Sequence, residues 1–211
     1  MGIVNFKLFL IAGILLNLTP GNDTIYILGK SMSQGKMAGL FSALGIGMGS
    51  IIHTLLATFG LSIIVAKSEF VFNLIKYIGS IYLIYLGVKM IFTKQGFEGV
   101  VVSHNYKRVK VFWSAVLTNV LNPKVAIFFL AFLPQFIDTN EGSHFLAFIL
   151  LGLTFTLTGT LWGIVLAVFS STIFDRFSGS SNLRNLMNRI SGCAFIGLGI
   201  KLALTNKYKS I

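Results

Sequence analysis

The stretch LFLIAGILLNLTPGNDTIYILG, residues 8–29, decides the class of this protein. It is long enough to cross a bilayer, which takes ~20 mainly apolar residues. Thr19-Pro20-Gly21 interrupts it near the middle, and proline removes a backbone hydrogen bond and disturbs the turn before it. The stretch therefore predicts a broken transmembrane helix. With Lys7 as the only basic flank and no usual cleavage site, we expect a membrane helix here and not a signal peptide.

Five more apolar stretches follow. Residues 39–66 and 145–174 contain no charged side chain, and residues 70–92, 111–136 and 190–205 carry one or two. A chain with 55% hydrophobic and 11% charged residues exposes too much apolar surface for an ordinary water-soluble domain. The sequence predicts an all-α integral membrane protein with six transmembrane helices, forming a single domain over residues 1–211.

The two halves of the chain resemble each other weakly. LGVK at 86–89 is similar to LGIK at 198–201, and Thr19-Pro20 is echoed by Asn122-Pro123. Three spans per repeat is an odd number, so the second repeat must enter the membrane upside down, as in many secondary transporters. We expect inverted repeats at about residues 1–93 and 111–211, joined by a connection at about 94–110, with the first and fourth helices broken.

The charge pattern predicts an orientation and excludes several partners. Alternating loops place ten Lys and Arg residues on one side and six on the other. The positive-inside rule then puts the 94–110 connection in the cytoplasm and both termini outside. The net charge of +11 is spread over these loops, so we expect the lipid bilayer and no nucleic acid as partner. Cys193 is the only cysteine, and we expect no metal and no cofactor.

The two proline breaks are candidate binding elements. Thr19 and Asn122 are good N-cap residues, and proline is favoured at the first helical position. Each break is therefore predicted to start a new half-helix, whose free N–H groups and partial positive charge suit a substrate carboxylate. The alternative is that the prolines only kink the helices for packing.

Three ionisable residues lie deep in the predicted spans. Placing the charge of Asp23 there costs at least ~2.5–3.5 kcal/mol. Asp23 either has a structural role, as a helix cap or the partner of a lysine, or it carries a proton or pairs with a substrate ammonium group. Lys124 opposes the dipole of its half-helix, so it pairs with Asp23, binds the substrate carboxylate, or reaches to the interface. His53 is a proton relay or an interhelical hydrogen bond. The candidate substrate-binding or coupling residues are Thr19, Pro20, Gly21, Asn22, Asp23, His53, Asn119, Asn122, Pro123 and Lys124.

Small and polar residues mark two other spans. Gly45 and Gly49 form a small-xxx-small pair, which predicts close helix contact. Trp162 lies too centrally for an interfacial belt. Thr154 with Thr158, and Thr156 with Thr160, place hydroxyl groups on two strips of the same span. These residues either line a cavity or form interhelical hydrogen bonds.

Several sequence blocks together resemble the LysE/RhtB superfamily of amino-acid exporters, small six-helix carriers of bacterial inner membranes. The blocks cover nearly the whole chain and include TPGNDT at 19–24, YLIYLG at 82–87, NPK at 122–124 and FLPQF at 132–136. The chain departs from the family at Asn22, where a second proline is usual, and at Ser50, where an acid is frequent. The resemblance implies a multi-pass inner-membrane protein that exports an amino acid or a derivative, driven by protons, and leaves open a homo-oligomer.

Two rival functions remain to be weighed. A channel, or a carrier for another small polar solute or ion, also uses broken helices and inward polar groups. An intramembrane enzyme needs a recognisable set of catalytic groups. The sequence has no H-E-x-x-H, no pair of buried aspartates and no G-x-S-x-G turn, so we expect no enzyme and no catalytic residue.

Overall fold

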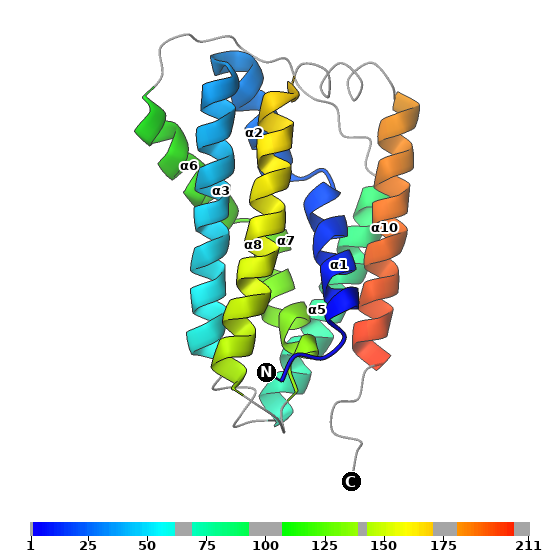
Figure 1. Ribbon diagram of the computed structural model, residues 1–211. Coiled ribbons are helices and arrows are strands. Elements are labelled where there is room, and N and C mark those ends of the chain that lie inside the picture. Colours follow the sequence, from blue (N-terminus) through cyan, green and yellow to red (C-terminus); the bar gives the residue numbers. More distant parts are fainter. Residues whose placement is uncertain (1, 62–68, 93–106, 139–142, 171–180, 205–211) are drawn as a thin grey trace.

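A computed structural model describes residues 2–61, 69–92, 107–138, 143–170 and 181–204. These residues form eight α-helices and no strand, apart from an isolated bridge between Ile3 and Ile137. The helices stand side by side in an elongated bundle (Figure 1). The all-α prediction is therefore confirmed.

Two helices are broken where the sequence predicts it. Helix α1 (Phe6–Leu18) is followed by α2 (Asn22–Gln34) with a bend of 47°, and α6 (Arg108–Val120) is followed at Pro123 with a bend of 49°. The second half of the latter comprises α7 (Pro123–Ile127), the π-helical η2 (Phe128–Phe132) and the 3-10 turn η3 (Leu133–Phe136). Each bent pair is long and apolar enough to be one membrane span.

Two unbroken helices meet the length and hydropathy needed for a span. They are α3 (Lys36–Leu56), which continues into the π-helical η1 (Ala57–Leu61), and α8 (His144–Val168). They run in opposite directions in Figure 1. Glycines bring them close: a Cβ at Gly163 would lie 3.0 Å from the Cβ of Ala43, and Gly47 faces Thr160.

The last pair consists of α5 (Glu69–Phe92) and α10 (Ser181–Leu204), which also run in opposite directions (Figure 1). A Cβ on Gly87 or on Gly192 would lie within 2.6 Å of the carbonyl oxygen of the other glycine. A Cβ on Gly199 would likewise lie 2.8 Å from the carbonyl oxygen of Ser80. The glycines of both LGxK segments therefore serve the close packing of α5 against α10.

Phenylalanine rings form much of the buried centre beside the breaks. The rings of Phe128 and Phe155 stack with centroids 4.7 Å apart. The rings of Phe9 and Phe136 meet edge to face, with centroids 5.3 Å apart. The outer faces carry exposed Leu, Ile and Phe side chains from most helices. An apolar exterior around a packed interior is what a lipid environment requires.

The beginnings of the helices are divided between the two ends of the bundle. The beginnings of α3, α6 and α10 lie at one end of the bundle, and the beginnings of α1 and α8 lie at the other (Figure 1). Of the predicted 94–110 connection, residues 94–106 lie outside the described residues. The same holds for residues 62–66, 171–174 and 205 of the expected spans.

Candidate substrate site between the two helix breaks

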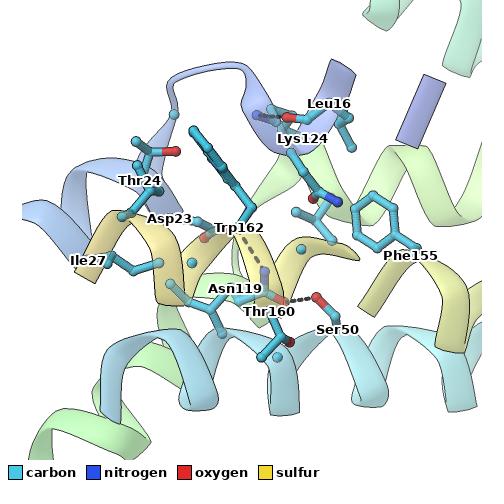
Figure 2. A pocket seen from close by; sticks show the side chains of 18 residues that line it. Leu16, Asp23, Thr24, Ile27, Ser50, Asn119, Lys124, Phe155, Thr160 and Trp162 are labelled. Carbon is cyan, nitrogen blue, oxygen red and sulfur yellow. Dashed lines mark hydrogen bonds between the residues drawn. The ribbon is translucent and has the colours of Figure 1, made fainter. Parts of the chain in front are cut away.

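A cavity of about 40 Å³ lies where the two helix breaks meet (Figure 2). Residues from α1, α2, α3, α6, α7 and α8 line it. One buried water needs ~10–15 Å³ on this measure, so the cavity is no larger than a few water molecules and has to enlarge for a larger ligand. Four of the predicted site residues line it, namely Gly21, Asp23, Asn119 and Lys124.

The ammonium group of Lys124 is held by the end of α1. Its Nζ donates to the carbonyl oxygens of Leu16 at 2.9 Å and Thr19 at 3.0 Å. The last carbonyls of a helix lack intrahelical donors and carry partial negative charge. They compensate the cation that the sequence marks as anomalous. The direct ion pair between Lys124 and Asp23, one of the sequence alternatives, is not formed, since Asp23 accepts instead from Asn119.

Gly21 allows Lys124 to approach the first break. A Cβ at this position would lie 3.3 Å from Nζ of Lys124. The backbone of Gly21 is extended, with φ −166° and ψ −169°, which any residue can adopt. The close approach of the lysine is therefore the structural reason for a small residue here.

Asn119 joins three helices. Its Nδ2 donates to Oδ2 of Asp23 on α2 at 2.8 Å, and its Oδ1 accepts from Oγ of Ser50 on α3 at 3.5 Å. Its backbone carbonyl accepts from Nε2 of His53 at 3.2 Å. Asn119 thus fixes the orientation of the Asp23 carboxylate (Figure 2).

His53 lies behind this network and does not line the cavity. Its ring stacks on Phe129 with centroids 5.6 Å apart. Because a carbonyl oxygen can only accept, Nε2 carries the hydrogen in the contact with Asn119. The structure shows the interhelical hydrogen bond that was one of the two sequence alternatives, and the relay role stays a prediction.

Gly49 makes room for Asn119. A Cβ at Gly49 would lie 2.6 Å from Oδ1 of Asn119, and one at Gly45 would lie 2.7 Å from the Cβ of Ala115. Both partners belong to α6. The close contact predicted for this glycine pair is confirmed, and its partner is the first half of the second broken helix.

Two polar atoms of the cavity residues have no partner. Oδ1 of Asp23 and Nε1 of Trp162 are both buried without a hydrogen bond, and both residues line the cavity (Figure 2). One atom accepts and the other donates. Since an unsatisfied buried group costs ~1–3 kcal/mol, two such atoms of opposite kind around one cavity make it the candidate ligand site.

The rest of the cavity wall is mainly apolar. Leu16, Ile27, Ile46, Phe155 and Leu166 contribute aliphatic and aromatic surface, and Gly159 and Gly163 of α8 also line the cavity. Thr160 and Asn17 add polar groups. A ligand with one charged end and one apolar end matches this lining.

The two helix starts are built differently. Asn122 is the N-cap of α7, accepts from the backbone N–H of Lys124 at 3.1 Å and is followed by Pro123 in the first turn, as predicted. The prediction of Thr19 as an N-cap with Pro20 at the first helical position is wrong. Thr19 ends α1 and its hydroxyl donates to the carbonyl of Leu15 at 2.6 Å, whereas α2 begins at Asn22.

Thr19, Pro20, Asn22, Asn122 and Pro123 therefore shape the breaks without lining the cavity. Residues outside the predicted set do line it, among them Asn17, Ser50, Phe155, Thr160 and Trp162. For Trp162, the sequence signal was its central position in the span. That its indole N–H lacks a partner could not be predicted from the sequence, because this depends on the fold. Among the described residues, no group of three or more His, Cys, Asp or Glu is arranged to hold a metal ion.

Comparison with known proteins identifies the family. Residues 14–206 match the family model described as LysE type translocator. An uncharacterized membrane protein of Vibrio cholerae is 32% identical over 92% of this chain and 94% of its own length. The uncharacterized membrane protein YrhP of Bacillus subtilis is 33% identical over 88% of this chain and 92% of its own.

A leucine efflux protein of Salmonella typhimurium is 26% identical over 96% of both chains. No solved structure matches the chain. With nearly the whole chain covered by the family model, this protein belongs to the LysE type translocators, a family of membrane transporters.

Proposed function

We propose that this protein exports a neutral amino acid with an apolar side chain across the bacterial cytoplasmic membrane. The observation that carries the proposal is the unpaired acceptor on Asp23 and the unpaired donor on Trp162 in one cavity. The family, and the relative named leucine efflux protein, support the same substrate class.

An amino acid presents both of the missing partners. Its ammonium group donates to Oδ1 of Asp23, and its carboxylate accepts from Nε1 of Trp162. Leu16, Ile27 and Phe155 then cover the side chain. Among the residues that the structure describes, Asp23 and Lys124 are the only charged ones that line the cavity, so a basic or acidic substrate side chain finds no further counter-charge there.

Lys124 serves the site in a different way. Its amine already donates to two carbonyl oxygens at the end of α1. We therefore assign Lys124 two roles: it stabilises the first helix break, and its charge attracts the substrate carboxylate. Direct binding of the carboxylate falls to Trp162. Charged groups of opposite sign on the two sides of the cavity suit a zwitterion.

We also propose that the chain crosses the membrane six times, as two inverted repeats of three spans each. Helices that are equivalent in the two halves pack against each other, α3 against α8 and α5 against α10, and each pair is antiparallel (Figure 1). Both broken helices line the cavity, together with α3 and α8. This arrangement favours an inverted-repeat carrier with its site at the repeat interface.

We infer proton coupling because the carboxylate of Asp23 would bind a proton and the substrate ammonium group in turn. Asp23 binds a proton when the substrate has left and exchanges it for the substrate ammonium group on the other side of the membrane. Export then runs with proton entry. In proteoliposomes, substrate efflux by the wild-type protein should rise with an imposed inward-directed proton gradient, and an efflux rate that does not respond to the gradient would contradict proton coupling.

A carrier is favoured over a channel. The cavity of about 40 Å³ has to enlarge to admit an amino acid, so each transport event requires a conformational change. Saturable flux would support the carrier, and large ohmic conductance would support the channel.

The test of substrate and site begins with export by cells that contain or lack the protein. Extracellular amino acids are profiled, and the exported one is then measured for Trp162→Phe and the matched control Trp113→Phe, whose ring is exposed on α6. Losing a hydrogen bond to a charged group corresponds to about a tenfold or larger loss of apparent affinity. Equal export by the two variants would contradict the assignment of Trp162.

A further inference from the structure

A second, larger cavity lies between α2 and α6, with a volume of about 440 Å³. Tyr26, Lys30 and Gln34 line it from successive turns of α2, and Lys107, Lys110, Val111 and Ser114 line it from the start of α6. Lys30, Lys107 and Lys110 give it three cations, and no acidic residue among those that the structure describes lines it. The cavity therefore attracts an anion and is separate from the candidate substrate site.

Polar contacts organise one wall of this cavity. The hydroxyl of Tyr26 donates to the carbonyl of Val111 at 3.3 Å, which ties α2 to α6. The amine of Lys30 lies 5.7 Å from the ring centroid of Tyr26. Oε1 of Gln34 is buried without a hydrogen-bond partner. The cavity thus offers cations for an anion and one free acceptor for a donor on the same ligand.

The surroundings point to a lipid. Beyond Ser114, α6 carries the exposed apolar side chains of Leu117 and Leu121, and Trp113 is exposed near the level of the cavity. Exposed tryptophan is typical of the membrane interface, and apolar helix surface below it accommodates acyl chains. Basic pockets between helices at a membrane surface bind anionic headgroups.

We propose that the cavity between α2 and α6 binds the headgroup of an anionic phospholipid, with its phosphate on Lys30, Lys107 and Lys110. A headgroup hydroxyl, such as those of phosphatidylglycerol, donates to the free Oε1 of Gln34. The lipid holds the carboxyl-terminal end of α2 against the beginning of α6. Because α2 carries Asp23 on its first turn, the bound lipid supports the wall of the candidate substrate site.

The test is lipid retention by the purified full-length protein in detergent, measured by native mass spectrometry. Phosphatidylglycerol, phosphatidylcholine and inorganic phosphate are the probes. The variant is Lys30→Gln with Lys110→Gln. The charge-matched control is Lys36→Gln with Lys89→Gln, since both of those lysines are exposed outside the cavity.

We expect the wild type and the control to retain phosphatidylglycerol in preference to phosphatidylcholine. Retention should fall by about 30-fold in the cavity variant, the effect of two lysine attractions at a membrane surface. The conservative variant Lys30→Arg with Lys110→Arg should keep the lipid. In the wild type, rising ionic strength should release phosphatidylglycerol.

Three results would overturn the proposal. The first is equal retention in the cavity variant and the control. The second is displacement of phosphatidylglycerol by inorganic phosphate, which would make this a site for soluble anions. The third is salt-independent retention in the wild type, which decides the matter even if the double variant fails to fold. None of these readouts depends on transport.

Discussion

The break before α2 and the break before α7 take their capping groups from different places. At the second break, Asn122 accepts from the backbone N–H of Lys124, so the cap is local. At the first break, α2 has no side-chain cap, and the carbonyls of Leu16 and Thr19 accept from Lys124, more than 100 positions away in sequence. The first break therefore depends on the second.

This difference teaches how a charge can be stable deep in a membrane protein. Lys124 sits at the start of a helix, where the dipole of its own helix is unfavourable. The carboxyl end of α1 provides the opposite field at 2.9 and 3.0 Å. One side chain thus joins both breaks, and the cavity lies beside it.

The largest expected effect comes from Lys124→Met. It leaves two carbonyls without their donor, at ~1–3 kcal/mol each, so the free energy of unfolding should fall by about 2–6 kcal/mol and export should cease. Thermal unfolding of the purified protein and an export assay measure the two effects. Lys89→Met, at an exposed lysine, should leave both unchanged. An unaltered melting temperature for Lys124→Met would contradict the proposal that the end of α1 depends on Lys124 of the second helix break.

A smaller effect is expected from Gly49→Ala. The new methyl group would lie 2.6 Å from Oδ1 and 2.7 Å from Cβ of Asn119, and overpacking of this kind costs ~1–3 kcal/mol. Asn119 should shift away from Asp23, which lowers export. Gly29→Ala is the control, because nothing lies within 4 Å of a Cβ there. If Gly49→Ala exported as well as this control, the role of Asn119 in orienting Asp23 would be refuted.

The smallest effects separate the two caps themselves. Asn122→Ala removes an N-cap and should lower the free energy of unfolding by ~1 kcal/mol. Thr19→Val removes only a hydroxyl whose acceptor, the carbonyl of Leu15, also accepts from the backbone N–H of Thr19, so its cost should be smaller than that of Asn122→Ala. Comparing the two melting temperatures tests the asymmetry, and a larger loss for Thr19→Val would reverse it.

The sequence predicted the features that depend on neighbouring residues. Pro20 and Pro123 located both breaks, and Gly45 with Gly49 located a close helix contact. The N-cap at Thr19 was wrong because Thr19 has an equally local alternative, its hydrogen bond to Leu15. Local pattern alone does not decide between a cap that starts one helix and a side chain that ends the previous one.

The contacts of the candidate site needed the fold. Asp23 and Lys124 were both recognised as costly, but their partners, Asn119 and the end of α1, lie on other helices. Trp162 stood out by position only, since whether an indole N–H is paired depends on what packs around it. Residue type therefore predicted which groups matter, and tertiary packing decided which of them meet.

The most direct test of the central claim, that the cavity between the breaks binds the substrate, is export by Asp23→Asn. The amide keeps the size of the side chain and an oxygen for Asn119 Nδ2, so the protein should still insert and fold. It removes the carboxylate that receives the substrate ammonium group. Export of the identified amino acid should be abolished at normal membrane abundance, and wild-type export by this variant would contradict the account.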